Sequence, residues 1–162
     1  MRRIHVHASA IALAFVSLGA APSVRRARPA VPTARVTVVK APESTDQRVV
    51  LLVRVEGDGM VLGSYQGRVH FDPAAFVVDS TAAGKDGSRY VNAAEAAKGS
   101  IRFAGFTTNG FKSADAVRIV GHATRPLASA KIAAELEVAG DLDGKSVAKT
   151  GLIAAAGLTA AK

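Results

Sequence analysis

Short runs of alternating apolar and polar residues, separated by clusters of Gly, Asp, Asn, Ser and Pro, repeat along the chain from residue 35 onward. Strand side chains point alternately to opposite faces, so this alternation predicts half-buried β-strands. About nine such runs occur, with turn clusters roughly every 8 to 14 residues, a spacing typical of sandwiches and jelly rolls. We therefore predict an all-β fold, a single domain of about nine strands that is a β-sandwich or a jelly roll.

Two segments are also compatible with helix by propensity alone. The run at residues 130–138 alternates, which favours a strand. One set of its residues, Ile132, Ala134, Leu136 and Val138, alternates with a second set, Ala133, Glu135 and Glu137. For residues 92–98 a short helical turn stays open.

The first 34 residues have a different character. Residues 1–20 combine Arg2 and Arg3 with a short apolar run and a small-residue end, which predicts a secretory signal peptide cut after Ala20 or Gly19. The apolar run is too short to span a bilayer, so an uncleaved anchor is the lesser alternative. Residues 21–34 mix Pro, Arg and Ala and predict a short disordered linker, and residues 157–162 form a C-terminal tail. We expect a secreted or periplasmic protein without stable membrane insertion after cleavage.

The charge balance does not indicate a nucleic-acid partner. The formal net charge is +8, but five arginines lie in the predicted signal and linker, which leaves +3 for the rest of the chain. No basic stripe with interleaved aromatic residues is present in the sequence. The chain also contains no cysteine, so disulfides, thiol nucleophiles and cysteine zinc sites are excluded.

The sequence offers little for catalysis or metal binding. Beyond the predicted signal, His70 and His122 are the only histidines, and no Asp or Glu stands at a ligand spacing beside either. Asp141 and Asp143 begin like a calcium loop, but the following positions lack its ligands, so a β-turn is favoured. No Gly-x-Ser-x-Gly motif occurs. We predict a protein without enzymatic activity, cofactor or metal.

Residues 65–80, "YQGRVHFDPAAFVVDS", join an alternating run to a second apolar run. Asp72-Pro73 ends the first run, because proline has no N–H to donate and the aspartate side chain can bond the backbone beyond it. Phe76 then returns an aromatic ring to the core. Alternation directs two sets of side chains to opposite faces: Tyr65, Gly67, Val69 and Phe71 inward, and Ser64, Gln66, Arg68 and His70 outward.

This stretch resembles the cohesin family, secreted nine-stranded jelly-roll modules that bind dockerin domains. Cohesins carry an alternating strand that ends in Tyr/Phe-Asp-Pro and is followed by an apolar residue and a new strand. Three later stretches resemble further cohesin strands in the same order: "GSIRFAGFTTNG", "SADAVRIVGHATRP" and "AKIAAELEVAGDLDGKSV". The resemblance covers about residues 35 to 156.

The resemblance also implies a binding face. In cohesins, outward Asn and Asp side chains of the strand before the Asp-Pro turn bond the dockerin helix, and the matching positions here are Ser64, Gln66 and Arg68. Small or apolar outward residues of the neighbouring strand pack on the dockerin. The matching positions on that strand are Ala104 and Phe106, followed by Thr107. The Asn/Asp identities are not retained, and Phe106 has the alternative role of closing an open end of the sandwich.

The resemblance implies a secreted, non-catalytic protein-binding module that docks a dockerin-like helical partner through one sheet face. Two alternatives stay open. A carbohydrate-binding module on the same scaffold would bind a polysaccharide, although aromatic residues are only 5% of the chain and no Trp occurs, leaving Tyr90 as its lone sugar platform. A structural cell-envelope domain would instead use its edge strands.

Overall fold

The computed structural model describes residues 32–84, 88–149 and 153–154. The predicted signal peptide, most of the linker and the C-terminal tail lie outside these residues. The strands, in chain order, are β1 (Thr33–Lys40), β2 (Val49–Asp58), β3 (Leu62–His70), β4 (Phe76–Ala83), β5 (Ser88–Asn92), β6 (Ser100–Phe111), β7 (Ser113–Ala123), β8 (Ala133–Gly140), β9 (Ala148–Lys149) and β10 (Ile153–Ala154). Two 3-10 turns, η1 (Ala96–Lys98) and η2 (Leu127–Ala130), interrupt them.

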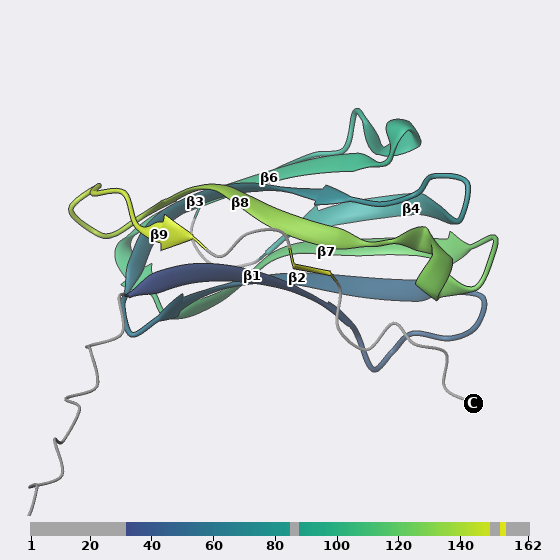
Figure 1. Cartoon of the computed structure of the whole chain (residues 1–162), viewed down its shortest axis with the longest axis horizontal. Helices are drawn as coiled ribbons and strands as arrows, with labels where there is room; N and C mark the ends of the chain where they lie inside the picture. The colour runs from purple at the N-terminus through teal and green to yellow at the C-terminus, as the bar shows by residue number, and fades with distance from the viewer. Residues whose placement is uncertain (1–31, 85–87, 150–152, 155–162) are drawn as a thin grey trace, which may run out of the picture.

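The strands form two five-stranded sheets that pack face to face (Figure 1). Sheet A has the order β4-β7-β2-β1-β9, and sheet B has the order β10-β8-β3-β6-β5. β1 and β2 are neighbours in sheet A and β5 and β6 are neighbours in sheet B, whereas every other pair of successive strands lies in opposite sheets. The predicted nine-stranded sandwich with jelly-roll topology is confirmed. Each predicted strand is present, and β9 is an additional two-residue strand that pairs in parallel with the start of β1.

β1 begins two residues before the predicted start of the domain at residue 35. Thr33 and Ala34 continue the antiparallel ladder with β2, opposite Asp58 and Gly57. The side chain of Ala34 is buried in the core. Burial and pairing therefore draw the end of the predicted linker into the sheet.

The core lies between the sheets and consists of the apolar residues that alternation directs inward. Val36, Leu51 and Val53 of sheet A are fully buried against sheet B. Burying each such side chain contributes about 1.5–3 kcal/mol relative to exposure. Aromatic rings fill the remaining space, with Phe71 and Phe76 packed edge to face at a centroid distance of 5.7 Å.

The Asp72-Pro73 turn forms as the sequence predicts. The carboxylate of Asp72 accepts a hydrogen bond from the N–H of Ala74 at 2.9 Å. Its carbonyl oxygen accepts the N–H groups of Ala75 and Phe76, both at 3.0 Å. The turn thereby satisfies the backbone between β3 and β4 and directs Phe76 into the core.

In β8 the simple alternation fails at one residue. The register with β3 places Gln66 opposite Val138 and Gly67 opposite Leu136, so Glu137 is an extra residue in a β-bulge. Leu136 is buried, but Val138 is 48% exposed. The strict alternation of the sequence does not hold here, because the bulge turns both Glu137 and Val138 to the outer side.

Residues 92–98 contain the helical turn left open by the sequence. After β5 ends at Asn92, η1 spans Ala96–Lys98 and closes at Gly99, whose φ of 80° is left-handed. The described residues include no helix with the length and hydropathy required to span a bilayer.

Candidate functional site

The outer side of sheet B brings the predicted site residues together. The β-ladders align side chains in rows across β8, β3, β6 and β5. The central row is Val138, Gln66, Ala104 and Tyr90, and the row beyond it contains Ser64, Phe106 and Ser88. A third row contains Glu135, Arg68, Arg102 and Asn92. We call these three rows the sheet-B face.

Large apolar side chains gather on the sheet-B face. Phe106 is 61% exposed and Tyr90 is 66% exposed, and both lie next to the short side chain of Ala104, whereas Val138 lies in the same row on the other side of Gln66. Only two other large apolar side chains of the described residues are exposed, Val77 and Leu142. Clustered exposure of this kind makes the face a candidate binding surface, because single soluble domains usually scatter such residues.

The structure places most predicted site residues as expected. Ser64, Gln66 and Arg68 lie on the outer side of β3, and Ala104 and Phe106 lie beside them on β6. Thr107 is not brought to the sheet-B face, because it follows Phe106 directly and alternation points it the other way. Its hydroxyl oxygen accepts the N–H of Asn109 at 3.2 Å within the irregular end of β6.

The polar side chains of the sheet-B face are held by Glu137. Gln66 Nε2 donates to Glu137 Oε2 at 2.9 Å, and Arg68 Nη2 lies 2.9 Å from Glu137 Oε1. The hydrogen bond from Gln66 lowers the pKa of Glu137, and the nearby guanidinium groups of Arg68 and Arg102 lower it further against the opposing effect of burial. Gln66 and Arg68 are therefore fixed in position before any partner arrives.

The sequence did not identify Glu137 or Val138 as face residues, because their position depends on the bulge in β8. Tyr90 and Arg102 could have been found from alternation. In β5, Ser88, Tyr90 and Asn92 alternate with the less exposed Arg89 and Val91, so they share the outer face. In β6, Arg102 lies between the buried Ile101 and Phe103 and therefore points outward.

Each histidine of the described domain pairs with one carboxylate from a distant part of the chain. His70 Nε2 lies 3.0 Å from Glu135 Oε1, at the end of the sheet-B face. His122 Nδ1 lies 3.0 Å from Asp79 Oδ1 on sheet A. Among residues 32–84, 88–149 and 153–154, no three His, Asp or Glu side chains come together as a metal site would require.

A pocket of about 300 Å³ borders the sheet-B face and is lined by Asn92, Glu95 and Arg102. Within the described part of the chain Arg102 forms no ion pair, in contrast to Arg68. The pocket therefore presents an unpaired guanidinium group next to the apolar centre of the face.

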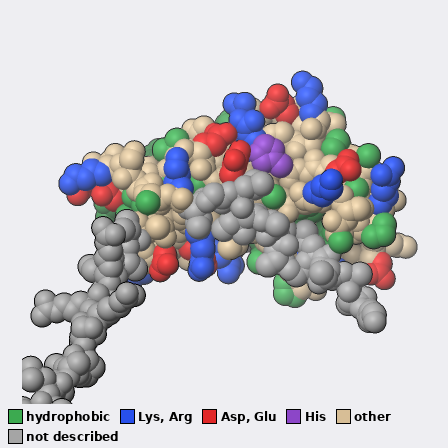
Figure 2. All heavy atoms as spheres, viewed as in Figure 1, with side chains coloured by type: hydrophobic (Ala, Val, Ile, Leu, Met, Phe, Trp, Pro, Cys, Tyr) green, Lys and Arg blue, Asp and Glu red, His purple; other side chains and the backbone are tan. Residues whose placement is uncertain are grey.

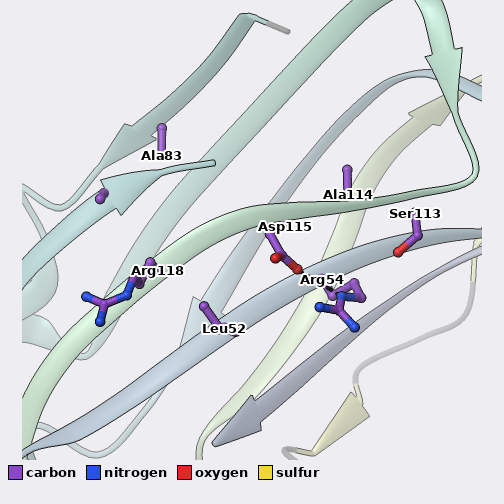
Figure 3. A pocket seen from close by; sticks show the side chains of 8 residues that line it. Leu52, Arg54, Ala83, Ser113, Ala114, Asp115 and Arg118 are labelled. Atoms are coloured by element: carbon purple, nitrogen blue, oxygen red, sulfur yellow. Dashed lines mark hydrogen bonds and ion pairs between the residues drawn. The ribbon is translucent and has the colours of Figure 1, made fainter. Parts of the chain in front are cut away.

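Sheet A carries a separate groove of about 520 Å³ on its outer side, lined by side chains of β2, β4 and β7 (Figure 3). Its charges are neutralised within the domain. Arg54 Nε donates to Asp115 Oδ1 at 2.8 Å, and Arg118 Nη2 donates to Glu43 Oε1 at 3.1 Å. The groove lacks the exposed aromatic side chains of the sheet-B face.

Acidic and basic side chains are interspersed over the face of the molecule seen in Figure 2. No continuous area of one sign is visible there, consistent with the balanced charge of the domain. On this face a nucleic acid would find no basic track to follow.

No protein-family model and no curated protein matches the chain. The structure does match that of a non-cellulosomal cohesin from the hyperthermophilic archaeon Archaeoglobus fulgidus, with a TM-score of 0.52 at 15% identity over 80% of this chain and 94% of that one. The fold is that of a cohesin module. A cohesin from a type I cohesin–dockerin complex of Clostridium thermocellum gives a TM-score of 0.53 at 15% identity over 76% and 97% of the two chains. A cohesin module of a Clostridium perfringens family 33 glycoside hydrolase gives 0.51 at 18% identity over 76% and 93%.

The cohesin fold confirms the resemblance carried by residues 65–80 and by the three later stretches. These structural matches, at about 15% sequence identity, establish the architecture and the strand order. It does not transfer a partner, because one fold supports many sites. The function must be argued from the sheet-B face itself.

Proposed function

We propose that this chain is a secreted, non-catalytic protein-binding module that docks a dockerin-like helical partner on the sheet-B face. The observation that carries the proposal is the gathering of the exposed side chains of Phe106, Tyr90 and Val138 on one face of a cohesin-like sheet. The cohesin–dockerin complex among the similar structures supports the choice of partner.

The face has the composition of a protein-binding site. Its centre is apolar, and exposed aromatic side chains of this kind act as binding anchors. Ala104 is short, so a partner side chain has room to approach the sheet between Tyr90 and Gln66. Gln66 supplies a polar group within the central row and Arg68 one in the adjoining row, and Glu137 already orders both side chains. Pre-ordering reduces the conformational entropy lost on binding.

Binding measurements with the dockerin modules encoded in the same genome test the proposal. The intact domain should bind at least one of them, and Phe106→Asp should abolish that binding because it places a charge in the apolar centre. Val77→Asp is the matched control, since Val77 is an exposed apolar residue on sheet A. Gln66→Ala should weaken binding without abolishing it.

The outcome separates the candidate functions. Binding that survives Phe106→Asp and is lost in Val77→Asp would place the site on sheet A and overturn the proposal. Binding to a glycan array that depends on Tyr90 would favour the carbohydrate-binding alternative. Concentration-dependent self-association in light scattering would favour a structural role.

The secreted location rests on the sequence of residues 1–20, which lie outside the described part of the chain. N-terminal sequencing of the exported protein tests it. We expect the mature chain to begin after Ala20 or Gly19.

A further inference from the structure

We propose that Arg102 selects a partner that carries a carboxylate, placed one helical turn from the side chain that packs on Ala104. The inference rests on the proposed function, because it concerns the same sheet-B face. It adds the charge and spacing that the partner must present.

Arg102 occupies a position where its charge is poorly compensated. Its direct neighbours across the ladders are Arg68 on β3 and Asn92 on β5. Like charges directly opposite each other on adjacent strands are destabilising. Both oxygens of the Glu137 carboxylate are in direct contact with Arg68 and Gln66, so Glu137 compensates the charge of Arg102 only from a distance.

The pocket beside Arg102 is suited to an acidic side chain. The side-chain oxygen Oδ1 of Asn92 accepts the N–H of Ala94 at 2.9 Å, which leaves the side-chain NH2 group of Asn92 as a donor next to the guanidinium. Guanidinium groups bind carboxylates with paired hydrogen bonds. Glu95 lines the same pocket and disfavours anions in general, so a carboxylate must be held there by the rest of an interface.

The arginines of the sheet A groove show the opposite arrangement. Figure 3 shows Arg54 and Asp115 lying together on neighbouring strands, and Arg118 pairs with Glu43. These arginines already have acidic partners within the domain. Among the described residues Arg102 makes no direct ion pair, although it acts on Glu137 from a distance, and it borders the exposed apolar side chains.

Strand and helix geometry set the spacing on the partner. Ala104 and Arg102 are two residues apart on β6, which corresponds to about 6.6–6.8 Å along the strand. A helix advances 1.5 Å per residue, so positions i and i+4 are about 6 Å apart on one face. A partner helix aligned with β6 can therefore place a small or apolar residue on Ala104 and an Asp or Glu, three or four positions along the helix, next to Arg102.

A selection experiment tests the proposal. A library of dockerin modules with randomised helix-surface positions is selected against the intact domain and, in parallel, against Arg102→Glu. Clones are kept only if Phe106→Asp abolishes their binding, which restricts them to the sheet-B face. Arg125→Glu serves as the matched control, because Arg125 is exposed in the loop after β7 and changes the net charge equally.

Selection on the intact domain should enrich Asp or Glu at one helix position, and selection on Arg102→Glu should enrich Lys or Arg there. The acidic clones should lose about tenfold or more in affinity for Arg102→Glu and keep it for Arg125→Glu. Clones that depend on Phe106 without acidic enrichment would overturn this inference and leave the proposed function standing. A selection that yields no Phe106-dependent clone would overturn both.

Discussion

The phenol ring of Tyr65 lies over Gly105, its partner across the β3–β6 ladder. A Cβ atom at Gly105 would stand 2.5 Å from both Cζ and the hydroxyl oxygen of Tyr65. The neighbouring pair repeats the arrangement in reverse, since a Cβ atom at Gly67 would stand 2.5 Å from Cζ of Phe103. Two aromatic rings thus fill the space above two glycines on the core side of the sheet. Burial raises the pKa of the Tyr65 hydroxyl, which accepts a hydrogen bond from Arg89 at 3.1 Å.

Gly105→Ala should lower the free energy of unfolding by about 1–3 kcal/mol, because the added methyl group overlaps the Tyr65 ring. Urea denaturation measures the loss. In the Tyr65→Leu background the same substitution should cost less, since the smaller side chain leaves room for the methyl group. Equal costs in both backgrounds would show that the ring is not the obstacle.

Phe106→Ala should leave the free energy of unfolding within about 0.5 kcal/mol of the parent, because its ring is exposed. Phe103→Ala on the same strand should cost about 3–5 kcal/mol, because that ring is buried. Thermal and urea denaturation of both variants make the comparison. A large loss for Phe106→Ala would support the alternative that this ring closes an end of the sandwich.

Val138→Ala should be nearly neutral for stability, whereas Leu136→Ala should cost about 2–5 kcal/mol. The difference follows from the bulge at Glu137, which turns Val138 outward. Urea denaturation of the two variants measures it. If the two substitutions cost the same, β8 has the unbroken alternation that its sequence suggests.

Gln66→Ala should raise the pKa of Glu137 towards its ordinary value of 4.5, because the hydrogen bond from Gln66 is the largest cause of the lowering. A carboxylate with a lowered folded-state pKa binds its proton more weakly when folded than when unfolded. Its stabilising contribution is therefore present above pH 4.5 and is lost as the pH falls through the folded-state pKa.

A carbon NMR titration of the Glu137 carboxyl group in the parent and in Gln66→Ala measures this shift. Ser88→Ala is a suitable control, because Ser88 lies on the same face but not beside Glu137 in the ladder. An unchanged pKa in Gln66→Ala would mean that Gln66 does not hold the carboxylate in solution.

The alternation of the sequence was sufficient for the strands and for the direction of most side chains. It placed Tyr65 inside and Phe106 outside, and it identified the Asp72 turn. Such positions follow from local pattern, because each strand side chain alternates whatever its neighbours are.

The missed features depend on strands that are distant in the sequence. The bulge in β8 exists only relative to β3, so the exposure of Val138 could not be predicted from its own segment. The same holds for Glu137, whose partners Gln66 and Arg68 lie on another strand. The pairing of β9 with β1 also required the assembled sandwich.

The central row of Val138, Gln66, Ala104 and Tyr90 crosses four strands, and no two of its members are close in the sequence. It is a discontinuous epitope, so no single peptide or hairpin of this chain reproduces it. A ligand of this row recognises the completed sandwich and not the unfolded chain, and by mass action it would stabilise the whole domain. The midpoint of thermal unfolding would therefore rise with partner concentration, and a melting screen could search for that partner without any label or known activity.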